Sequence, residues 1–357
     1  MIKKIYKYRP LSDFLFKELF YCEIYFATYP ELNDPLDLTV DLDFRPKEVN
    51  QLEYLINSLV KISVFPPYEE DERGMDIDTY KRFFAFAKNF KLRTELCENL
   101  YNKYRTGVDF ISLDQIIEDL KIMAEQYNTD FRYDLLKKEI VRLTNIFFRS
   151  SYITCFSETC TDFLMWSHYA SKHQGVCLEF TLNKEGEFPY IISTKRNVDQ
   201  KKYSEKHSVW DTENHICWDN IHKVEYKTGI PSLNYFDFAP VFENEHDCDL
   251  MGLSKSKWHR FAYELEKVFC HKTDAWKYEK EWRAIEINFG KIKQPEERIR
   301  HYPIEALTKI YFGIRTPHNV KERIFQIINN KNSQIEYYEA KLTDDRCLDF
   351  TMYNIGN

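Results

Sequence analysis

The clearest indication of the fold is the segment TDFLMWSHYASKHQGVCLEF, residues 161–180, in the middle of the chain. Apolar residues recur at helical spacing over residues 163–170, and Gly175 then precedes the apolar and aromatic run 176–180. This change of pattern predicts a helix that is followed at once by a strand. Because similar changes occur along the rest of the chain, the sequence predicts an α+β fold.

Further helix and strand signals lie on both sides of this stretch. Residues 5–9 alternate apolar or aromatic with polar side chains, and a helical pattern at 13–20 follows Ser12. Other strands are predicted at 23–28, 152–156, 281–287, 309–313 and 335–339, and other helices at 255–271 and 319–329. We therefore expect a mixed or antiparallel sheet as the core of the fold.

Residues 46–148 have a different character. They are rich in Glu and Lys, contain almost no Gly, and carry apolar residues at helical spacing, which predicts a helical insertion with the chemistry of a scaffold or partner surface. A single core usually stops growing at about 250–300 residues. For this chain of 357 residues we expect one α+β domain, residues 1–357, with the insertion as its elaboration.

Composition and charge narrow the class of protein. The net charge of −7 provides no general attraction for nucleic acid. No run approaches the roughly 18 apolar residues of a membrane span, and the first residues, MIKKIYKYRP, lack the apolar core of a signal peptide. Nine cysteines without a CxxC pair are typical of reduced thiols, and no zinc-module spacing is present. We expect a cytoplasmic protein with no membrane association and no metal.

The first candidate site lies within residues 161–180. Trp166, His168, Tyr169 and His173 occur within eight positions, and on a helix His168 lies beside an apolar face. Two interpretations stay open: these side chains form a binding or catalytic site, or His168 is a hydrogen-bonded core residue that braces the following turn while His173 lies in a loop.

The second candidate site is WKYEKEWRAIE, residues 276–286. On a strand, Glu281 and Arg283 point to one face and Trp282 to the other. The charged pair is either a surface ion pair of small energetic value, or it orients a substrate. In the second case Glu281 accepts hydrogen bonds from ribose hydroxyls and Arg283 holds an anionic group. The flanking Trp276, Tyr278 and Trp282 then supply a stacking wall.

The third candidate site is formed by the ends of the first two predicted strands. Arg9 ends the first and Thr28 the second, and ligand contacts often gather at strand ends. The sequence Asn33-Asp34-Pro35 that follows is typical of an Asx turn.

Together these motifs resemble a bacterial family catalogued as domain of unknown function 2971. The resemblance rests on KYR (7–9), YFAT and NDPLD (within 25–37), CFS, LMWSHYA and HQGVCLEF (within 155–180), WKYEKEWR (276–283) and YFG (311–313). These motifs span nearly the whole chain outside the helical segment.

At the level of fold, the chain is also similar to ADP-ribosyltransferases in the order of three features. These are an arginine on the first strand, a strand that ends in Thr after aromatic residues, and a glutamate on a late strand. This resemblance implies that Arg9 holds ribose or phosphate, Thr28 the nicotinamide ribose, and Tyr25 or Tyr29 the nicotinamide ring. Glu281 then binds the ribose 2′-hydroxyl and stabilises the oxocarbenium-like transition state as the N-glycosidic bond breaks. The motif around His168 is an addition that this superfamily does not require.

We therefore expect an NAD-consuming effector, similar to an ADP-ribosyltransferase or an NAD glycohydrolase, in bacterial anti-phage defence. NAD is the expected substrate, and a protein or nucleic acid is a possible acceptor. The expected catalytic residues are Glu281 and His168. The expected substrate-binding residues are Arg9, Thr28, Tyr25, Tyr29, Trp166, Tyr169, His173, Trp282 and Arg283.

Two alternatives stay open. One is a metal-assisted nuclease or phosphodiesterase that uses His168, His173, Glu179 and Glu281. The other is a non-catalytic module that binds a nucleotide or peptide through its aromatic residues and a partner protein through the helical insertion.

Overall fold

The computed structural model describes residues 4–64, 77–125, 131–181, 191–193, 215–217, 221–238, 268–287 and 292–354. The chain divides into two compact units. The first comprises Met1–Leu38, Arg149–Gly229 and Phe269–Asn357, and the second Thr39–Phe148 and Ile230–Val268. The predicted helical insertion, residues 46–148, lies within the second unit, to which residues 230–268 also belong.

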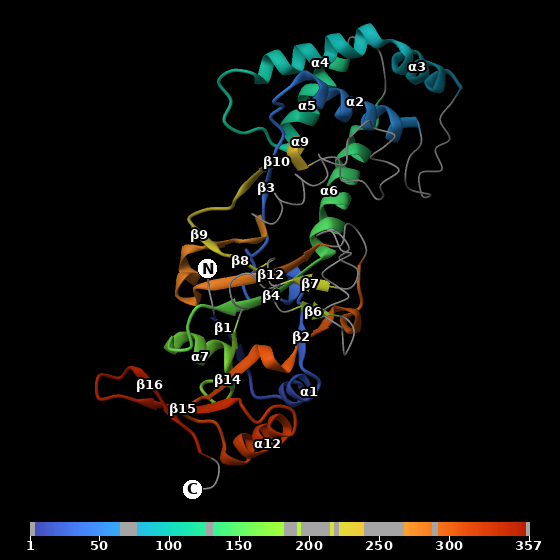
Figure 1. Ribbon diagram of the computed structural model, residues 1–357. Coiled ribbons are helices and arrows are strands. Elements are labelled where there is room, and N and C mark those ends of the chain that lie inside the picture. Colours follow the sequence, from blue (N-terminus) through green and yellow to red (C-terminus); the bar gives the residue numbers. More distant parts are fainter. Residues whose placement is uncertain are drawn as a thin grey trace, which may run out of the picture. The chain divides into compact units, whose positions relative to one another are not determined.

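The first unit is built on an eight-stranded sheet with the order β16-β15-β14-β5-β1-β4-β12-β8 (Figure 1). Its strands are β1 (Lys4–Arg9), β4 (Ser151–Ser157), β5 (Val176–Thr181), β8 (Ile221–Lys223), β12 (Glu281–Ile287), β14 (Leu307–Phe312), β15 (Glu336–Leu342) and β16 (Leu348–Met352). Neighbouring strands are antiparallel except β14 and β15, which are parallel. The sheet is therefore mixed, and the predicted α+β class is confirmed.

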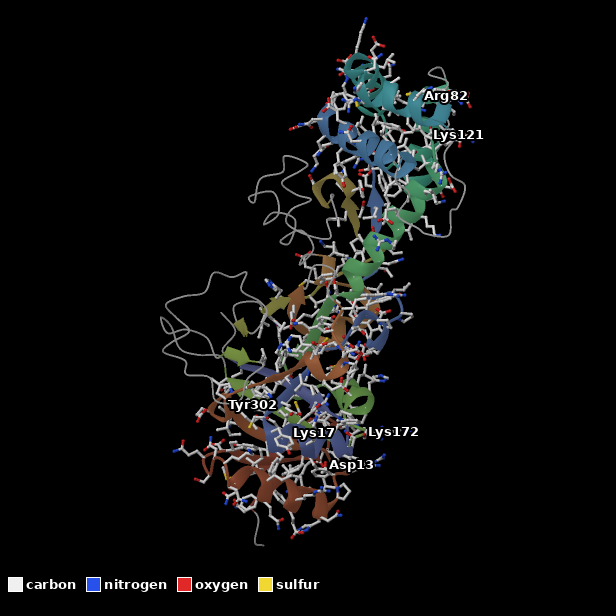
Figure 2. The ribbon with its side chains drawn as sticks, turned by 90° about the vertical axis from the view of Figure 1, so that its right-hand side faces the viewer. Asp13, Lys17, Arg82, Lys121, Lys172 and Tyr302 are labelled. Carbon is white, nitrogen blue, oxygen red and sulfur yellow. The ribbon has the colours of Figure 1, made fainter. Side chains whose placement is uncertain are left out.

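One face of this sheet is covered by two helices, α1 (Asp13–Tyr21) and α12 (His318–Asn329). Leu19 of α1 and Ile324 of α12 are fully buried in one apolar cluster with Ile5 of β1. Phe180 of β5 belongs to the same cluster and packs on Tyr302, which is labelled in Figure 2, with 5.0 Å between the ring centroids. Each fully buried aliphatic or aromatic side chain contributes roughly 1.5–3 kcal/mol to folding.

The opposite face of the sheet packs against α7 (Phe163–Tyr169). Met165 and Trp166 of this helix form a second buried cluster with Tyr8 of β1 and Tyr311 of β14. The strands supply alternate residues to the two clusters, as the side-chain alternation of a strand requires. The helix and strand predicted from residues 161–180 are both present, as α7 and β5.

The turn between α7 and β5 has an unusual backbone. Ser171, Lys172 and His173 all have positive φ angles, between 48° and 69°, which costs energy in a residue with a side chain. Lys172, labelled in Figure 2, is exposed. The turn is held by bonds from the His173 backbone N–H to the Trp166 carbonyl and from the Arg315 backbone N–H to the His173 carbonyl, at 3.2 and 2.9 Å.

The second predicted strand is shorter than expected. It ends at Tyr25, and a short 3-10 helix, η1 (Tyr29–Glu31), follows. The Glu31 side chain accepts a hydrogen bond from the backbone N–H of Thr28 at 2.8 Å, and Pro30 sits in the first turn of η1. These two features favour a helical turn over an extended chain.

Smaller elements complete the first unit. A four-stranded sheet has the order β2-β13-β6-β7, and β9 pairs with β11 in parallel. The strands are β2 (Glu23–Tyr25), β6 (Ile191–Ser193), β7 (His215–Cys217), β9 (Glu225–Lys227), β11 (His271–Thr273) and β13 (Ile299–His301), and the further 3-10 helices are η4 (Asp274–Glu279), η5 (Pro295–Arg298) and η6 (Ile304–Ala306).

The second unit is mainly helical. Its elements are β3 (Asp41–Asp43), α2 (Val49–Val64), α3 (Ile77–Lys88), α4 (Phe90–Tyr104), α5 (Leu113–Ala124), α6 (Tyr133–Arg149), β10 (Ser232–Asn234) and α9 (Tyr235–Phe238). Leu55, Leu100 and Leu120 are buried on the apolar faces of α2, α4 and α5. None of the helices in the described ranges has the length and apolar character needed to cross a membrane.

Gly175 allows β1 and the α7 turn to approach each other closely. A Cβ atom at this position would lie 2.2 Å from the carbonyl oxygen of Arg9 and 3.0 Å from Cα of Ala170. We expect Gly175→Ala to lower the free energy of unfolding by about 3 kcal/mol, because backbone must move to relieve the overlap. Urea unfolding measures this loss.

Gly229→Ala is the matched control. Gly229 has a φ of +85° but no atom within 4 Å of an added Cβ, so only conformational strain of about 1–2 kcal/mol is expected. A Gly175→Ala loss no larger than that of Gly229→Ala would contradict the close approach.

Candidate functional site

The centre of the candidate site is the guanidinium group of Arg283 in β12, which is completely buried. Its Nε and Nη2 donate to Glu281 at 2.8 and 3.1 Å, and its Nη1 and Nη2 donate to Asp37 at 2.8 and 2.7 Å. Nη1 also donates to the carbonyl of Phe269 at 2.7 Å. All five N–H donors of the group are thus used, so Arg283 holds two carboxylates in bidentate fashion and has no free donor for a ligand.

Lys272 of β11 brings a third carboxylate to the same place. Its Nζ lies 2.7 Å from Glu279, 3.3 Å from Glu281 and 3.8 Å from Asp37. We call Asp37, Lys272, Glu279, Glu281 and Arg283 the buried charge network. Three carboxylates face two cations, so one negative charge is uncompensated when every group is ionised, and an uncompensated buried charge is costly.

The two glutamates of the network respond to this excess charge in opposite ways. Burial, opposed by Lys272 but reinforced by the charge of Glu281, raises the pKa of Glu279 to about 7. Burial also disfavours ionised Glu281, but Arg283 and Lys272 outweigh it and lower the pKa of Glu281 to about 2. Near neutral pH, Glu281 is therefore ionised while Glu279 can exchange a proton, which is the division of roles that acid–base catalysis uses.

The network reaches the surface through Tyr169 of α7. The Tyr169 hydroxyl donates to Oε1 of Glu279 and accepts a hydrogen bond from Nδ2 of Asn33 at 2.5 Å. Tyr169 is half-buried and Asn33 is exposed. A chain of hydrogen bonds thus runs from solvent at Asn33 to a carboxylate that is only 3% exposed.

Aromatic side chains surround this end of the network. The ring of Tyr278 lies 6.1 Å from that of His168 and 6.2 Å from that of Trp276, between centroids. His168 is exposed, and Trp276 and Tyr278 are half-buried. We call His168, Tyr169, Trp276 and Tyr278 the aromatic rim. Planar side chains that are partly open to solvent are suited to stacking on a planar ligand.

Segments far apart in the chain meet at this site. Asp37 and Arg283, which bind each other directly, are 246 residues apart. The predicted placement of Glu281 and Arg283 on one face of β12 agrees with their mutual hydrogen bonds. Lys272 lies outside every motif recognised in the sequence, whereas Asp37 lies in the motif NDPLD (33–37) and Glu279 in WKYEKEWR (276–283). Their acidic side chains within these two motifs were the available signal.

Several predicted binding residues lie elsewhere in the first unit. Nε of Arg9 donates to Glu18 of α1 at 2.7 Å. Tyr25 donates its hydroxyl to Glu31 at 3.0 Å, and Tyr29 begins η1. Arg9 and Tyr25 thus contact glutamates close to them in the sequence, and Tyr29 belongs to a local helical turn.

Thr28 and Glu281 are not brought together. Ala27, next to Thr28, bridges to Ile153 near the start of β4, whereas Glu281 pairs with Ser157 at its end. Four residues of strand span about 13 Å. The structure therefore separates the residue predicted for the nicotinamide ribose from the predicted catalytic glutamate.

The remaining predicted residues take part in packing. Trp282 points away from Glu281 and donates its indole N–H to Glu158 at 2.8 Å. Trp166 is fully buried and donates to the carbonyl of Cys160 at 2.7 Å. Nε2 of His173 lies 3.1 Å from Oγ of Ser167, and burial together with Arg315 lowers the pKa of His173.

Among the residues that the structure describes, no group of three or more His, Cys, Asp or Glu side chains is arranged to hold a metal ion.

The fold and the site define the class: an α+β protein in which the buried charge network lies beside the aromatic rim. Residues 165–284 match the family described as "Protein of unknown function (DUF2971)", which confirms over this range the family predicted from the sequence. The matched range includes Tyr169, Glu279, Glu281 and Arg283. No curated protein and no solved structure matches the chain.

Removal of Asp37 tests how strongly the fold depends on the network. Asp37→Ala leaves two donors of a completely buried guanidinium without their partner. We expect the free energy of unfolding to fall by about 3–5 kcal/mol, as when one partner of a buried ion pair is removed. The exposed pair of Lys227 and Glu225 provides the control, since Lys227→Ala should cost less than about 0.5 kcal/mol. Similar urea unfolding curves for the two variants would show that Arg283 does not need Asp37.

The raised pKa of Glu279 predicts a pH dependence of stability. Because this pKa rises from 4.5 to about 7 on folding, the protonated form contributes stability that is complete below pH 4.5 and lost as the pH rises through 7. The lowered pKa of Glu281 acts only below this window. We expect the free energy of unfolding to fall more steeply between pH 4.5 and 8 in the wild type than in Glu279→Gln. Parallel profiles from denaturant titrations would rule out Glu279 as the titrating group.

Proposed function

We propose that the protein cleaves the N-glycosidic bond of NAD and transfers the ADP-ribosyl group to water or to a macromolecular acceptor. One observation carries the proposal: Glu279 and Glu281, two buried carboxylates beside the aromatic rim, have pKa values shifted in opposite directions. Cleavage of such a bond builds positive charge on the ribose and requires a proton to leave the nucleophile. One ionised and one proton-exchanging carboxylate meet these two needs.

Each residue of the site has a defined role in this proposal. Ionised Glu281 stabilises the oxocarbenium-like ribose, and Arg283 and Lys272 hold its carboxylate in place. Glu279 takes up the proton of the nucleophile. The C1′–N bond breaks, and its electron pair passes to the ring nitrogen of nicotinamide. The aromatic rim, which includes His168, stacks on a base or on the nicotinamide ring.

The acceptor and the setting belong to the same proposal. A protein or nucleic acid is the proposed macromolecular acceptor, and the helical second unit is the proposed surface for a partner protein. The reaction takes place in the cytoplasm as part of bacterial anti-phage defence. This part of the proposal rests on the resemblance of the motifs alone.

A specific observation favours a second candidate function. Glu279 and Glu281 are each only 3% exposed, and Arg283 and Lys272 already bind Glu281. In a non-catalytic module, the network would be structural and the aromatic rim alone would bind a nucleotide.

NMR of NAD incubated with the protein tests the proposal. We expect free nicotinamide to appear with the wild type and its rate of release to fall by roughly 10²–10³ in Glu281→Gln, because the developing positive charge loses its counter-charge. The control is Glu336→Gln, which removes the same charge from an exposed glutamate bound to Lys309 and should match the wild type. Thermal unfolding shows whether both variants are folded.

Other outcomes separate the alternatives. Intact NAD after long incubation, alone and with protein and RNA acceptors, overturns the glycosyl transfer. Retained NAD without turnover, lost in Tyr278→Ala, supports the binding module. If the protein cleaves RNA or DNA, if chelators abolish this cleavage, and if NAD stays intact, the metal-assisted nuclease is supported.

A further inference from the structure

We propose that Tyr169 is a proton relay between the nucleophile and Glu279, because the hydroxyl of this half-buried residue is bonded to Glu279 on one side and to exposed Asn33 on the other. The inference rests on the proposed function and deepens it. It assigns a chemical role to Tyr169 and a positioning role to Asn33, and it specifies a nucleophile that carries an O–H group.

The hydrogen bonds of the Tyr169 hydroxyl leave one place for a ligand. A phenol has one proton to donate and two lone pairs to accept with. The proton goes to Oε1 of Glu279, and one lone pair accepts from Nδ2 of Asn33. Within the described part of the chain, the second lone pair has no donor. This lone pair is able to accept a hydrogen bond from the O–H group of a bound nucleophile.

Glu279 itself is less accessible than the phenol. Its Oε2 accepts from Nζ of Lys272 at 2.7 Å, its Oε1 accepts from Tyr169, and 3% of the residue is exposed. Ser157 donates to its backbone carbonyl at 2.7 Å, which fixes the residue at the end of η4. A nucleophile that arrives from solvent therefore meets the hydroxyl of Tyr169 before it meets the carboxylate.

The relay consists of two proton transfers, one onto Tyr169 and one from Tyr169 onto Glu279. The O–H group of the nucleophile donates its proton to Oη of Tyr169 while Tyr169 passes its own proton to Oε1 of Glu279. The nucleophile oxygen bonds to C1′, and the electron pair of the breaking C1′–N bond goes to nicotinamide. Burial and the charge of Glu279 raise the pKa of Tyr169, so a free tyrosinate does not accumulate and the two transfers occur together.

The relay depends on the charges that face Glu279 from each neighbouring element. These titratable and charged groups are Lys272 of β11, Tyr278 beside it in η4, Glu281 of β12, Tyr169 of α7 and Tyr226 of β9. The hydrogen bond from Tyr169 stabilises ionised Glu279 and so lowers its pKa. Loss of that hydrogen bond leaves Glu279 with a higher pKa.

Tyr169→Phe tests the relay through two independent measurements. The first is an NMR titration of carboxyl carbons in protein labelled with ¹³C-glutamate, in which the Glu279 signal is identified by its loss in Glu279→Gln. We expect this signal to titrate at higher pH in Tyr169→Phe. The second is turnover of NAD, for which we expect kcat to fall about 10²-fold with little change in KM, and the acidic limb of the kcat profile to move to higher pH.

Tyr338→Phe is the matched control, because the Tyr338 hydroxyl also donates to a glutamate, the exposed Glu336 of the same strand, β15, at 2.9 Å. It should change neither measurement. Asn33→Ala is the second test variant and alters an exposed side chain. Loss of its hydrogen bond to Tyr169 should lower kcat about fivefold, and it serves in place of Tyr169→Phe if that variant does not fold.

The outcomes distinguish the relay from the proposed function. An unmoved Glu279 titration in Tyr169→Phe overturns the relay, and so does an unchanged kcat when the titration moves. In both cases nicotinamide is still released by the wild type, so the proposed function stands. Failure of the wild type to release nicotinamide overturns the proposed function and, with it, the chemical step of the relay.

Discussion

The structure of the first unit depends on one buried guanidinium group. Arg283 is completely enclosed, and its donors are satisfied only because Asp37, Glu281 and the carbonyl of Phe269 come from three different parts of the chain. Removal of a cation from water is costly, and the cost is offset only when every donor has a partner. This requirement sets the positions of two segments relative to the sheet: the one after η1, which contains Asp37, and the one before β11, which contains Phe269.

The same requirement explains the chemistry of the site. Two carboxylates are enough to satisfy Arg283, and a third, Glu279, is left to share Lys272. In a region that excludes water, the excess negative charge falls on the least supported carboxylate, whose pKa rises while that of Glu281 falls. A network that stabilises the fold therefore also creates a group that exchanges protons near neutral pH.

The two faces of the eight-stranded sheet differ in polarity: one is packed by apolar side chains, and the other also buries polar and charged groups. One face packs on α1 and α12 through aliphatic and aromatic side chains such as Ile5, Ile310 and Phe180. The other carries Tyr8, Cys177 and Tyr311, which pack against Trp166 of α7. Glu179 is buried beside them and accepts hydrogen bonds from Tyr6 and Tyr311 at 3.2 and 2.9 Å. A phenol combines an apolar ring with a hydroxyl donor, so the high tyrosine content lets this face bury carboxylates without leaving them unsatisfied.

The sequence alone determined the local structure: the helix and strand of residues 161–180, the α+β class, and the placement of Glu281 and Arg283 on one face of a strand. Each of these depends on the spacing of side chains within one segment, which periodicity reports directly. Which charged side chains meet depends on the tertiary structure. Arg9 and Thr28, predicted from their order along the chain, lie with Glu18 and Glu31, whereas Asp37, Lys272 and Glu279 join Glu281. Ion pairs depend on which segments become neighbours in the folded sheet. A local sequence pattern around Arg283 therefore does not indicate that its partner is Asp37, 246 residues away.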